Sequence, residues 1–281
     1  MTGVDEAREA LGARLRELRR RAGLSGRQLA ALAGWHESKV SKLEYGRIKP
    51  SDTDIRAYCE HADATDQLAD LLATLHNIDT AYLEWRRVLA TGVQRRQQKS
   101  VKLEAEAANL RVYTTQVVPG LLQTAEYAEG IFRRHIEFYR VPDDLDAGVS
   151  KRMERQRILY QRDHRFHFLI TEQALYTTVG NDDVMRGQLD RLASIIGMPR
   201  ITVGIIPATA EALIVSTSFV MFDNRMVMVE GTAAELTITQ PREVAIYGRA
   251  FNVLAGQSVT GEDARSLIRK ALAHRQSAAG Q

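Results

Sequence analysis

The chain has 281 residues, of which 44% are hydrophobic and 26% are charged. This composition is typical of folded globular proteins, and the length allows about two domains. A single cysteine, Cys59, excludes an internal disulfide framework and is usual for a reducing compartment. The sequence contains no apolar run of membrane-spanning length and its start is charged rather than signal-like, so we predict a cytoplasmic protein.

Positive charge is concentrated near the start of the chain. The net charge is only +3, yet residues 14–49 contain ten lysines and arginines against three acidic residues, a local net charge of +7. The rest of the chain therefore carries −4. A strongly basic segment is typical of a surface that attracts nucleic-acid phosphates, although a merely solvated basic face would have the same composition.

The basic segment contains a predicted helix-turn-helix motif. An amphipathic helix is expected over residues 5–22, and Ser25 with Gln28 forms a capping-box pattern at the start of a second helix. Gly34 allows a sharp turn into a third helix, which Gly46 stops. Two short helices joined in this way present the later one to the major groove of DNA.

Two further helices are expected after this motif. Ser51 and Asp54 form the start signal of a fourth helix, and a fifth follows it. We predict that residues 1–79 form an all-α helix-turn-helix domain. Residues 80–112 are predicted to form a helical connector of two helices broken near Gly92.

The pattern changes in the second part of the chain. Short β-branched and aromatic runs alternate with helical stretches, which predicts an α+β domain with a small sheet over residues 113–276. Residues 277–281 are expected to form a disordered tail. The expected strands cover residues 166–171, 201–206, 218–222 and 226–230, and the expected helices cover residues 124–139, 143–162, 182–196, 242–255 and 261–275.

The third helix of the motif carries the side chains expected to read bases. In helix-turn-helix proteins the first residues of this helix meet base edges in the major groove. A carboxylate accepts from cytosine N4, a lysine donates to guanine, and serine hydroxyls bond to either. The alternative is that Glu37 only complements the helix dipole and that Lys39 is solvated. The base-reading candidates are Glu37, Ser38, Lys39, Ser41 and Lys42.

A second set of side chains flanks this helix and is expected to contact the DNA backbone. Such contacts fix the register of a protein on the duplex without reading its sequence. The backbone candidates are Arg27, Gln28, His36, Arg47 and Lys49.

Ten residues of the motif stand in a recurring register, namely Leu24, Leu29, Ala30, Leu32, Gly34, Ser38, Val40, Ser41, Glu44 and Gly46. In this register the segment resembles the Xre-type, lambda-repressor-like helix-turn-helix family, whose common pattern is similar to LTQxELAxxLGxSxSxVSxxExG. The resemblance implies an all-α bundle, binding to double-stranded DNA and a role as a transcription factor. Two positions depart from the pattern, because Gly26 replaces a common glutamine and His36 stands where serine often caps the recognition helix.

Several segments of the second domain also follow a known order: VVPGLLQTAEYA (117–128), KRMERQ (151–156), TEQAL (171–175), QL (188–189), ITVGIIP (201–207) and VMVE (227–230). They resemble an uncharacterised C-terminal domain that is joined to helix-turn-helix motifs in many actinobacterial regulators. In those regulators the gene commonly neighbours one for a very small partner protein, and the pair is described as antitoxin-like. The resemblance implies a regulator with such a partner but supplies no effector.

One polar cluster in the second domain is a candidate for an effector or partner site. Arg152, Arg155 and Gln156 lie within about one helical turn and can bind an anion or a carboxylate. Glu172 completes the candidate set. The alternative is that these arginines pair with acids of the same domain, such as Glu172 or Glu230.

The sequence carries no catalytic motif that we recognise. It has no Walker-type loop, GxSxG elbow or dinucleotide fingerprint. His164 and His167 have a metal-like spacing but lack nearby cysteines or paired carboxylates, so we expect neither a metal nor a cofactor. The protein is therefore not expected to be an enzyme.

Together these patterns predict a DNA-binding transcriptional regulator that forms a homodimer and whose second domain binds an effector or a small partner protein. Dimerisation is expected because two recognition helices about 34 Å apart fit a pseudo-palindromic site. The alternative is an antitoxin-like interaction module that sequesters the small partner and uses DNA binding for autoregulation. An RNA- or membrane-associated factor has only the basic residues in its favour.

Overall fold

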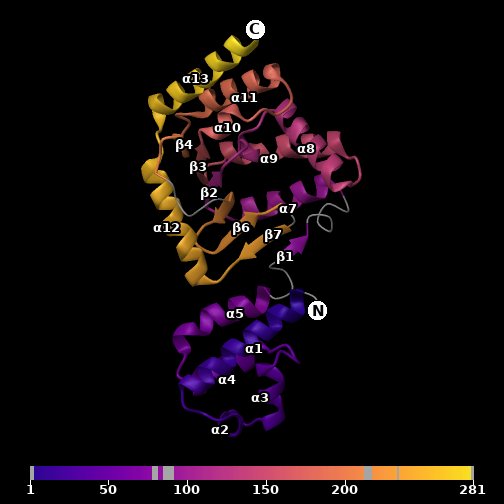
Figure 1. Cartoon of the computed structure of the whole chain (residues 1–281), viewed down its shortest axis with the longest axis vertical. Helices are drawn as coiled ribbons and strands as arrows, with labels where there is room; N and C mark the ends of the chain where they lie inside the picture. Colours follow the sequence, from indigo (N-terminus) through magenta and orange to yellow (C-terminus); the bar gives the residue numbers. More distant parts are fainter. Residues whose placement is uncertain (1–2, 78–81, 85–91, 212–216, 233, 280–281) are drawn as a thin grey trace. The chain divides into compact units, whose positions relative to one another are not determined.

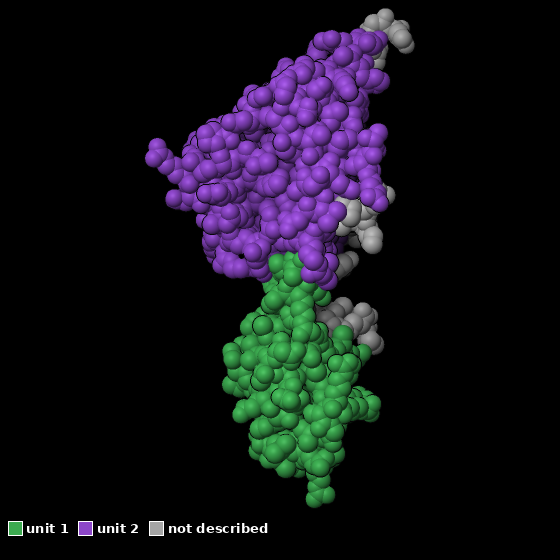
Figure 2. Space-filling model, turned by 90° about the vertical axis from the view of Figure 1, so that its left-hand side faces the viewer, with its two compact units in different colours: residues 1–82, 237–245 green, residues 83–236, 246–281 purple. Residues whose placement is uncertain are grey.

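The computed structural model describes residues 3–77, 82–84, 92–211, 217–232 and 234–279. The chain divides into two compact units, which Figure 2 colours separately. The N-terminal unit contains residues 1–82 and 237–245, and the second unit contains residues 83–236 and 246–281. Each unit has its own hydrophobic core.

The N-terminal unit is a bundle of helices (Figure 1). Each helix turns an apolar stripe inward, so that Leu15, Leu29, Leu43, Tyr58 and Leu71 are fully buried in one cluster. The helices are α1 (Gly3–Arg21), α2 (Gly26–Leu32), α3 (Glu37–Glu44), α4 (Asp52–His61), a 3₁₀ turn η1 (Thr65–Gln67) and α5 (Leu68–Asn77). The predicted all-α helix-turn-helix bundle is confirmed.

Local start signals place two of these helices. Ser25 Oγ accepts from the backbone N–H of Gln28 at 3.2 Å, and the Gln28 side chain accepts from the Ser25 N–H at 2.8 Å. Ser51 and Asp54 make the same reciprocal pair at the start of α4. Each box satisfies backbone donors that a helix start leaves without intrahelical partners. Both predicted capping boxes are confirmed.

Residues 237–245 also belong to the N-terminal unit, although no local pattern in the sequence assigns them there. Arg242 Nε lies 2.9 Å from Asp70 Oδ2, and Arg242 Nη2 lies 3.1 Å from Asp66 Oδ2. The helix predicted over residues 242–255 begins in this segment, as α12 (Pro241–Gln257). Contacts between residues so far apart in sequence have no local signature.

The second unit is built on a mixed sheet with the strand order β1-β7-β6-β5-β2-β3-β4 among the described residues. β2, β3 and β4 run parallel, with Leu110 opposite Phe166 and Phe166 opposite Ile201. β5 and β6 join them antiparallel. The strands are β1 (Tyr82–Glu84), β2 (Asn109–Thr114), β3 (Arg165–Thr171), β4 (Ile201–Ile206), β5 (Phe219–Phe222), β6 (Met226–Glu230) and β7 (Ala234–Ile238).

Helices cover both faces of this sheet (Figure 1). On one face, Phe166 and Phe168 of β3 pack into the large core cluster together with residues of the helices around them, such as Leu189 and Ile268. On the other face, the Phe251 ring of α12 lies 5.0 Å from the His167 ring. The remaining helices are α7 (Val93–Ala105), α8 (Ala125–Tyr139), α9 (Leu145–Arg155), α10 (Gln173–Tyr176), α11 (Asp182–Ile195) and α13 (Gly261–Ala279), with the 3₁₀ turns η2 (Gly120–Leu122) and η3 (Gln156–Tyr160). The predicted α+β class is confirmed.

The prediction of a helical connector over residues 80–112 is wrong in its details. Among the residues of this range that the structure describes, α7 is the only helix, while Tyr82–Glu84 and Asn109–Thr114 are strands; most of the first predicted helix falls on residues 80–81 and 85–91, which lie outside the described part. Val112, which we expected on a helix stripe, pairs with Phe168 in the parallel ladder. Apolar residues at helical spacing can also occur in a short strand. Here the pairing with β3 selects the strand over the helix.

The predicted disordered tail is also wrong where the structure describes it. Helix α13 continues to Ala279, and the Ser277 hydroxyl donates to the Ala273 carbonyl at 3.1 Å. Residues 280–281 lie outside the described part. The helix continues because its alanine-rich end has high helix propensity.

None of the described helices combines the length and the apolar character that crossing a membrane requires.

Candidate nucleic-acid interface

Helices α2 and α3 form the predicted helix-turn-helix. Gly34 adopts a φ of +65° at the turn between them, in the left-handed region that glycine enters at little cost. Leu29 of α2 and Val40 and Leu43 of α3 are buried against the bundle. These contacts fix the rotation of α3 about its own axis, because burying Val40 and Leu43 leaves the opposite side of the helix in solvent.

A buried ion pair anchors the end of α3. Arg19 Nε donates to Glu44 Oε1 at 2.5 Å and Arg19 Nη2 donates to Glu44 Oε2 at 2.8 Å, while the Tyr58 hydroxyl donates to Glu44 Oε1 at 2.5 Å. The Glu44 and Arg19 side chains are only 4% and 11% exposed. Three elements, α1, α3 and α4, thus meet at one carboxylate.

The same partners set the ionisation of Glu44. Burial by itself would raise the pKa of this carboxyl, but the hydrogen bonds from Arg19 and Tyr58 outweigh burial and hold the pKa below its ordinary value. Burial and the hydrogen bond to Glu44 raise the pKa of Tyr58 far above its usual range. The network is therefore ionised as a carboxylate, a guanidinium and a neutral phenol at neutral pH.

Close packing of α1 on the end of α3 depends on two glycines. A Cβ added at Gly12 would lie 2.6 Å from the carbonyl oxygens of Leu43 and Glu44. Gly46 has a φ of +65°, and a Cβ there would lie 2.8 Å from the backbone nitrogen of Glu9. The backbones approach so closely at these points that no larger residue fits without displacement.

The outward side of α3 carries four of the five predicted base-reading residues. Glu37, Ser38, Ser41 and Lys42 are all exposed. Successive members are separated by steps of one or three residues, so they share one face of the helix, as a groove-reading surface requires. Tyr45, which follows the helix directly, is also exposed.

Lys39 differs from the other four. Its Nζ lies 2.6 Å from Asp54 Oδ1 and 4.4 Å from the centre of the Trp35 ring. The ammonium group therefore links α3 to the capping box of α4. In this arrangement Lys39 helps to position the helix, and it would reach a base only by leaving Asp54.

The predicted backbone contacts lie at the ends of the motif helices. Arg27 at the start of α2 is exposed, and so are Arg47 and Lys49 after α3. Gln28 is exposed as well, but its Oε1 is used in the capping box. His36 Nδ1 accepts from the Ser38 N–H at 3.2 Å, so the imidazole caps α3 in the place where serine is common.

Arg16 is a neighbour of this surface that the sequence did not single out. Its guanidinium lies 4.9 Å from the centre of the Tyr45 ring. The guanidinium of Arg47, which follows α3 in the chain, lies 5.9 Å from the centre of the same ring. Two cations near one exposed aromatic ring form a positive edge beside α3. Arg16 is on α1, so only the folded bundle brings it there.

The polar cluster predicted in the second unit exists, but with different members. Arg155 Nε lies 2.7 Å from Glu104 Oε2, and Gln156 Nε2 donates to the Gln123 carbonyl at 2.6 Å. Glu172 is not part of it, because its carboxylate accepts from the Ala208 N–H at 2.8 Å. Glu172 lines a different hollow from Arg152 and Arg155, and Glu104 of α7 is the acid that pairs with Arg155.

Comparison with protein families identifies both units. Residues 97–270 match the family described as a domain of unknown function (DUF5753), and this match covers more than half of the chain. The chain belongs to the DUF5753 family. Residues 10–72 match a helix-turn-helix domain, which supports a DNA-binding regulator. The DUF5753 match lies within the second unit apart from the segment 237–245.

Comparisons with individual proteins add little. No curated protein matches the chain. Among solved structures, NucT from Helicobacter pylori matches with a TM-score of 0.36 and 10% identity over 64% of this chain and 97% of that chain. TrmBL2, described as an archaeal chromatin protein with a novel mode of DNA binding, matches with a TM-score of 0.32 and 10% identity over 85% and 88% of the two chains. Scores this low establish no shared fold.

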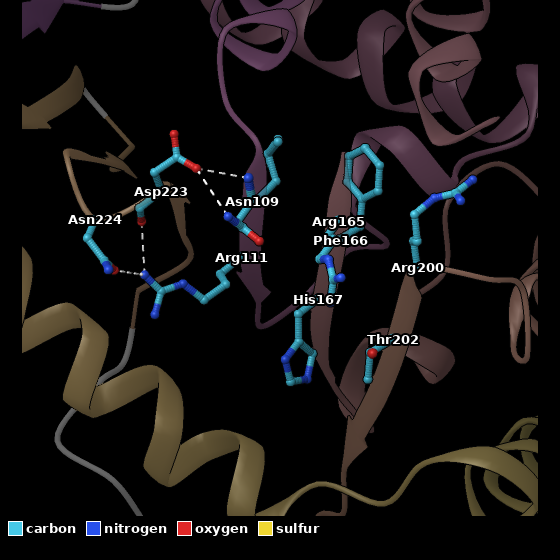
Figure 3. A pocket seen from close by; sticks show the side chains of 10 residues that line it. Asn109, Arg111, Arg165, Phe166, His167, Arg200, Thr202, Asp223 and Asn224 are labelled. Atoms are coloured by element: carbon cyan, nitrogen blue, oxygen red, sulfur yellow. Dashed lines mark hydrogen bonds between the residues drawn. The ribbon is translucent and has the colours of Figure 1, made fainter. Parts of the chain in front are cut away.

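The DUF5753 domain also has an open basic hollow at one end of its parallel strands (Figure 3). Arg111, Arg165 and Arg200 line it, together with His167. Arg111 Nη2 donates to the Asp223 carbonyl at 2.9 Å, so this arginine holds the turn between β5 and β6. The hollow has a volume of about 430 Å³ and is lined mostly by polar residues, with Leu110 and Phe166 as its apolar members.

Proposed function

We propose that this DUF5753 protein is a sequence-specific, DNA-binding transcriptional regulator of the Xre type. The observation that carries the proposal is the outward face of α3. Glu37, Ser38, Ser41 and Lys42 are exposed together on a helix whose inward face is locked by Val40, Leu43 and the Arg19–Glu44 pair. A rigid helix with a polar outer face, set in a segment of net charge +7, is what reading of the major groove requires.

The proposal assigns separate roles to the surface residues. Lys42 and the exposed residues before it on α3 read base edges, while Arg27, Arg47 and Lys49 hold phosphates. Lys39 acts as a positioning residue through Asp54. His36 and Gln28 cap the starts of their helices, and in this proposal they also contact the DNA backbone from there.

We further propose that the regulator acts as a homodimer and that its second unit receives an effector or a small partner protein. Two copies of α3 separated by about one turn of DNA would contact a pseudo-palindromic operator. Light scattering of the full chain, alone and on DNA, tests the dimer. A monomer under both conditions would rule it out.

The direct test of DNA binding uses the full chain and a library of fragments from its own genome. Selection at low ionic strength, followed by sequencing, should enrich a small set of related, pseudo-palindromic sites. The affinity for these sites should fall steeply as salt increases, because phosphate contacts release counterions. Equal recovery of all fragments would mean that the protein binds DNA without sequence specificity, which contradicts the proposed base reading. Recovery of no fragment would refute DNA binding altogether.

A further inference from the structure

The second unit contains a cavity of about 290 Å³, near the lower end of the range for small-molecule sites. It lies among strands β2, β3, β5 and β6 and helices α7, α8 and α9. One side is apolar and is formed by Val112, Phe168, Val220, Phe222 and Met228. The space equals about ten water molecules at roughly 30 Å³ each, so a medium-sized organic molecule would fill it.

Three arginines line the cavity, and two of them meet carboxylates. Arg155 Nε lies 2.7 Å from Glu104 Oε2. Arg96 is ion-paired with the fully buried Glu235, and its Nη2 also lies 3.5 Å from Glu230, which is 55% exposed. These two arginines therefore have acidic partners within the domain.

Arg152 is bonded differently. Its Nη1 donates to Gln123 Oε1 at 2.5 Å, its Nε donates to Gln97 Oε1 at 3.2 Å, and its guanidinium lies 4.2 Å from the centre of the Phe132 ring. In the part of the chain that the structure describes, no ion pair joins Arg152 to a carboxylate. Amide oxygens and an aromatic face orient a cation without neutralising it.

The surroundings of Arg152 disfavour its charge. Burial, followed by the nearby charge of Arg155, lowers the pKa of Arg152 to about 9. The group is still a cation at neutral pH, held in a place where positive charge is costly. An anion brought into the cavity would relieve this cost, because it would form the direct ion pair that the more distant carboxylates of Glu230 and Glu104 do not make with Arg152.

The cavity also offers an unused hydroxyl. Thr114 Oγ1 is buried and makes no hydrogen bond with any described residue. A buried hydroxyl without a hydrogen-bond partner is costly, so such groups are rare unless a ligand or water completes them. Thr114 lies on β2, whose Val112 contributes to the apolar side.

Space is also kept free beside Arg152. A Cβ added at Gly120 would lie 3.3 Å from the Arg152 guanidinium carbon. Gly120 therefore lets the guanidinium lie against the backbone of η2, at the wall of the cavity. Alanine at this position would press on the group that we expect to meet the ligand.

We propose that this cavity binds a small amphipathic organic acid, with the anionic group on Arg152 and the apolar part along the Phe168 and Val220 side. Thr114 would bond to a polar atom of the same ligand. In the regulator proposed above, this acid is the effector of the second unit, and only that regulatory role rests on the proposed function. The binding itself does not depend on DNA.

The first test measures binding of three probes to the full chain by titration calorimetry. Octanoate and octyl phosphate share an eight-carbon chain and differ in the anionic group, and octan-1-ol has the same chain without charge. We expect at least one of the acids to bind ten times or more tightly than the alcohol. Which acid binds better decides between a carboxylate and a phosphate ligand. If neither acid binds better than the alcohol, the proposal is overturned.

The second test compares variants. Arg152→Gln should weaken binding of the preferred acid at least tenfold and leave the alcohol unchanged, whereas Arg157→Gln, an exposed arginine on η3, should change neither more than twofold. Thr114→Val should weaken acid binding by a smaller factor of about three to ten, as expected for one hydrogen bond. An unchanged affinity in Arg152→Gln would overturn the assignment.

A third variant keeps the test decisive if Arg152→Gln does not fold. Val220→Phe adds volume to the apolar side of the cavity without touching the arginines, and it should abolish binding of all three probes. Undiminished binding would show that the probes bind elsewhere. DNA binding is measured on the same preparations, so acid binding without DNA binding refutes only the regulator, and DNA binding without acid binding refutes only the cavity proposal.

Discussion

Each unit contains an arginine that packs against its interior, buried for Arg19 and half-buried for Arg152, and the two have different partners. In the N-terminal unit, Arg19 meets both oxygens of Glu44, and Tyr58 completes the set. In the second unit, Arg152 meets only amide oxygens and an aromatic ring. A buried charge with a full set of partners fixes structure, whereas one without an opposite charge leaves an interaction for a ligand to make.

The difference extends to where each unit would meet its ligand. The N-terminal unit closes its charge network inside and presents its remaining cations outward, around α3. The second unit keeps a cation at the wall of a cavity. DNA is a large anion and is bound from outside, while a small acid can be enclosed.

The largest expected effect comes from removing the partner of the paired arginine. Glu44→Ala leaves Arg19 buried without an opposite charge and should lower the free energy of unfolding of the N-terminal unit by about 3–5 kcal/mol. Amide hydrogen exchange of α1 to α5 in the full chain measures this. The control, Glu37→Ala, removes an exposed glutamate from the same helix and should change the free energy of unfolding obtained from the exchange rates by less than about 0.5 kcal/mol. An effect of Glu44→Ala no larger than that would contradict the structural role of the pair.

The next effect concerns the outward face of α3. Lys42→Ala should cost about 1–3 kcal/mol of binding free energy at the operator and little at other sequences, because a base contact is lost. Arg27→Ala is its counterpart: it should weaken binding to all sequences and lower the salt dependence by about one phosphate contact. Fluorescence anisotropy with operator and scrambled DNA at several salt concentrations separates the two. Identical behaviour of the two variants would refute the division between base and backbone contacts.

Acid should weaken the N-terminal unit through two carboxyls. Burial by itself would raise the pKa of Asp54, but the bonds from Lys39 and Ser51 outweigh it, so the pKa of Asp54 is lowered, as is that of Glu44. Both therefore stabilise the fold above their ordinary pKa values of 3.8 and 4.5, and this stabilisation is lost as the pH falls through the lower folded values.

Urea unfolding at a series of pH values between about 7 and 2 measures this loss. Lys39→Met removes one attraction on Asp54 and should make the pH dependence shallower. An unfolding free energy of the N-terminal unit that stays constant down to the lowest pH would show that neither carboxyl is held by its partners.

The smallest effect is expected where the arginine has no acidic partner. Arg152→Gln strands no carboxylate, so the free energy of unfolding should stay within about 1 kcal/mol of the natural chain. Urea unfolding without added acid measures it. A loss as large as that expected for Glu44→Ala would mean that Arg152 is a structural residue like Arg19.

Local signals in the sequence determined much of the N-terminal unit. The Ser25 and Ser51 capping boxes, the turn at Gly34 and the apolar stripes act within a few residues, so they could be interpreted without the fold. The same is true of the strands β3 to β6. The candidate residues of α3 followed from their place at the start of the second helix of the motif.

Only the tertiary structure decided which partner each polar side chain meets. The sequence could not show that Lys39 turns to Asp54, that Arg16 reaches Tyr45, or that Arg155 pairs with Glu104 and leaves Arg152 with amides. Nor could it show that Val112 lies in a strand beside β3. Capping and periodicity depend on neighbours in the chain, whereas ion pairs, strand pairing and cavities depend on residues brought together from distant positions, and a single sequence carries no record of those distances.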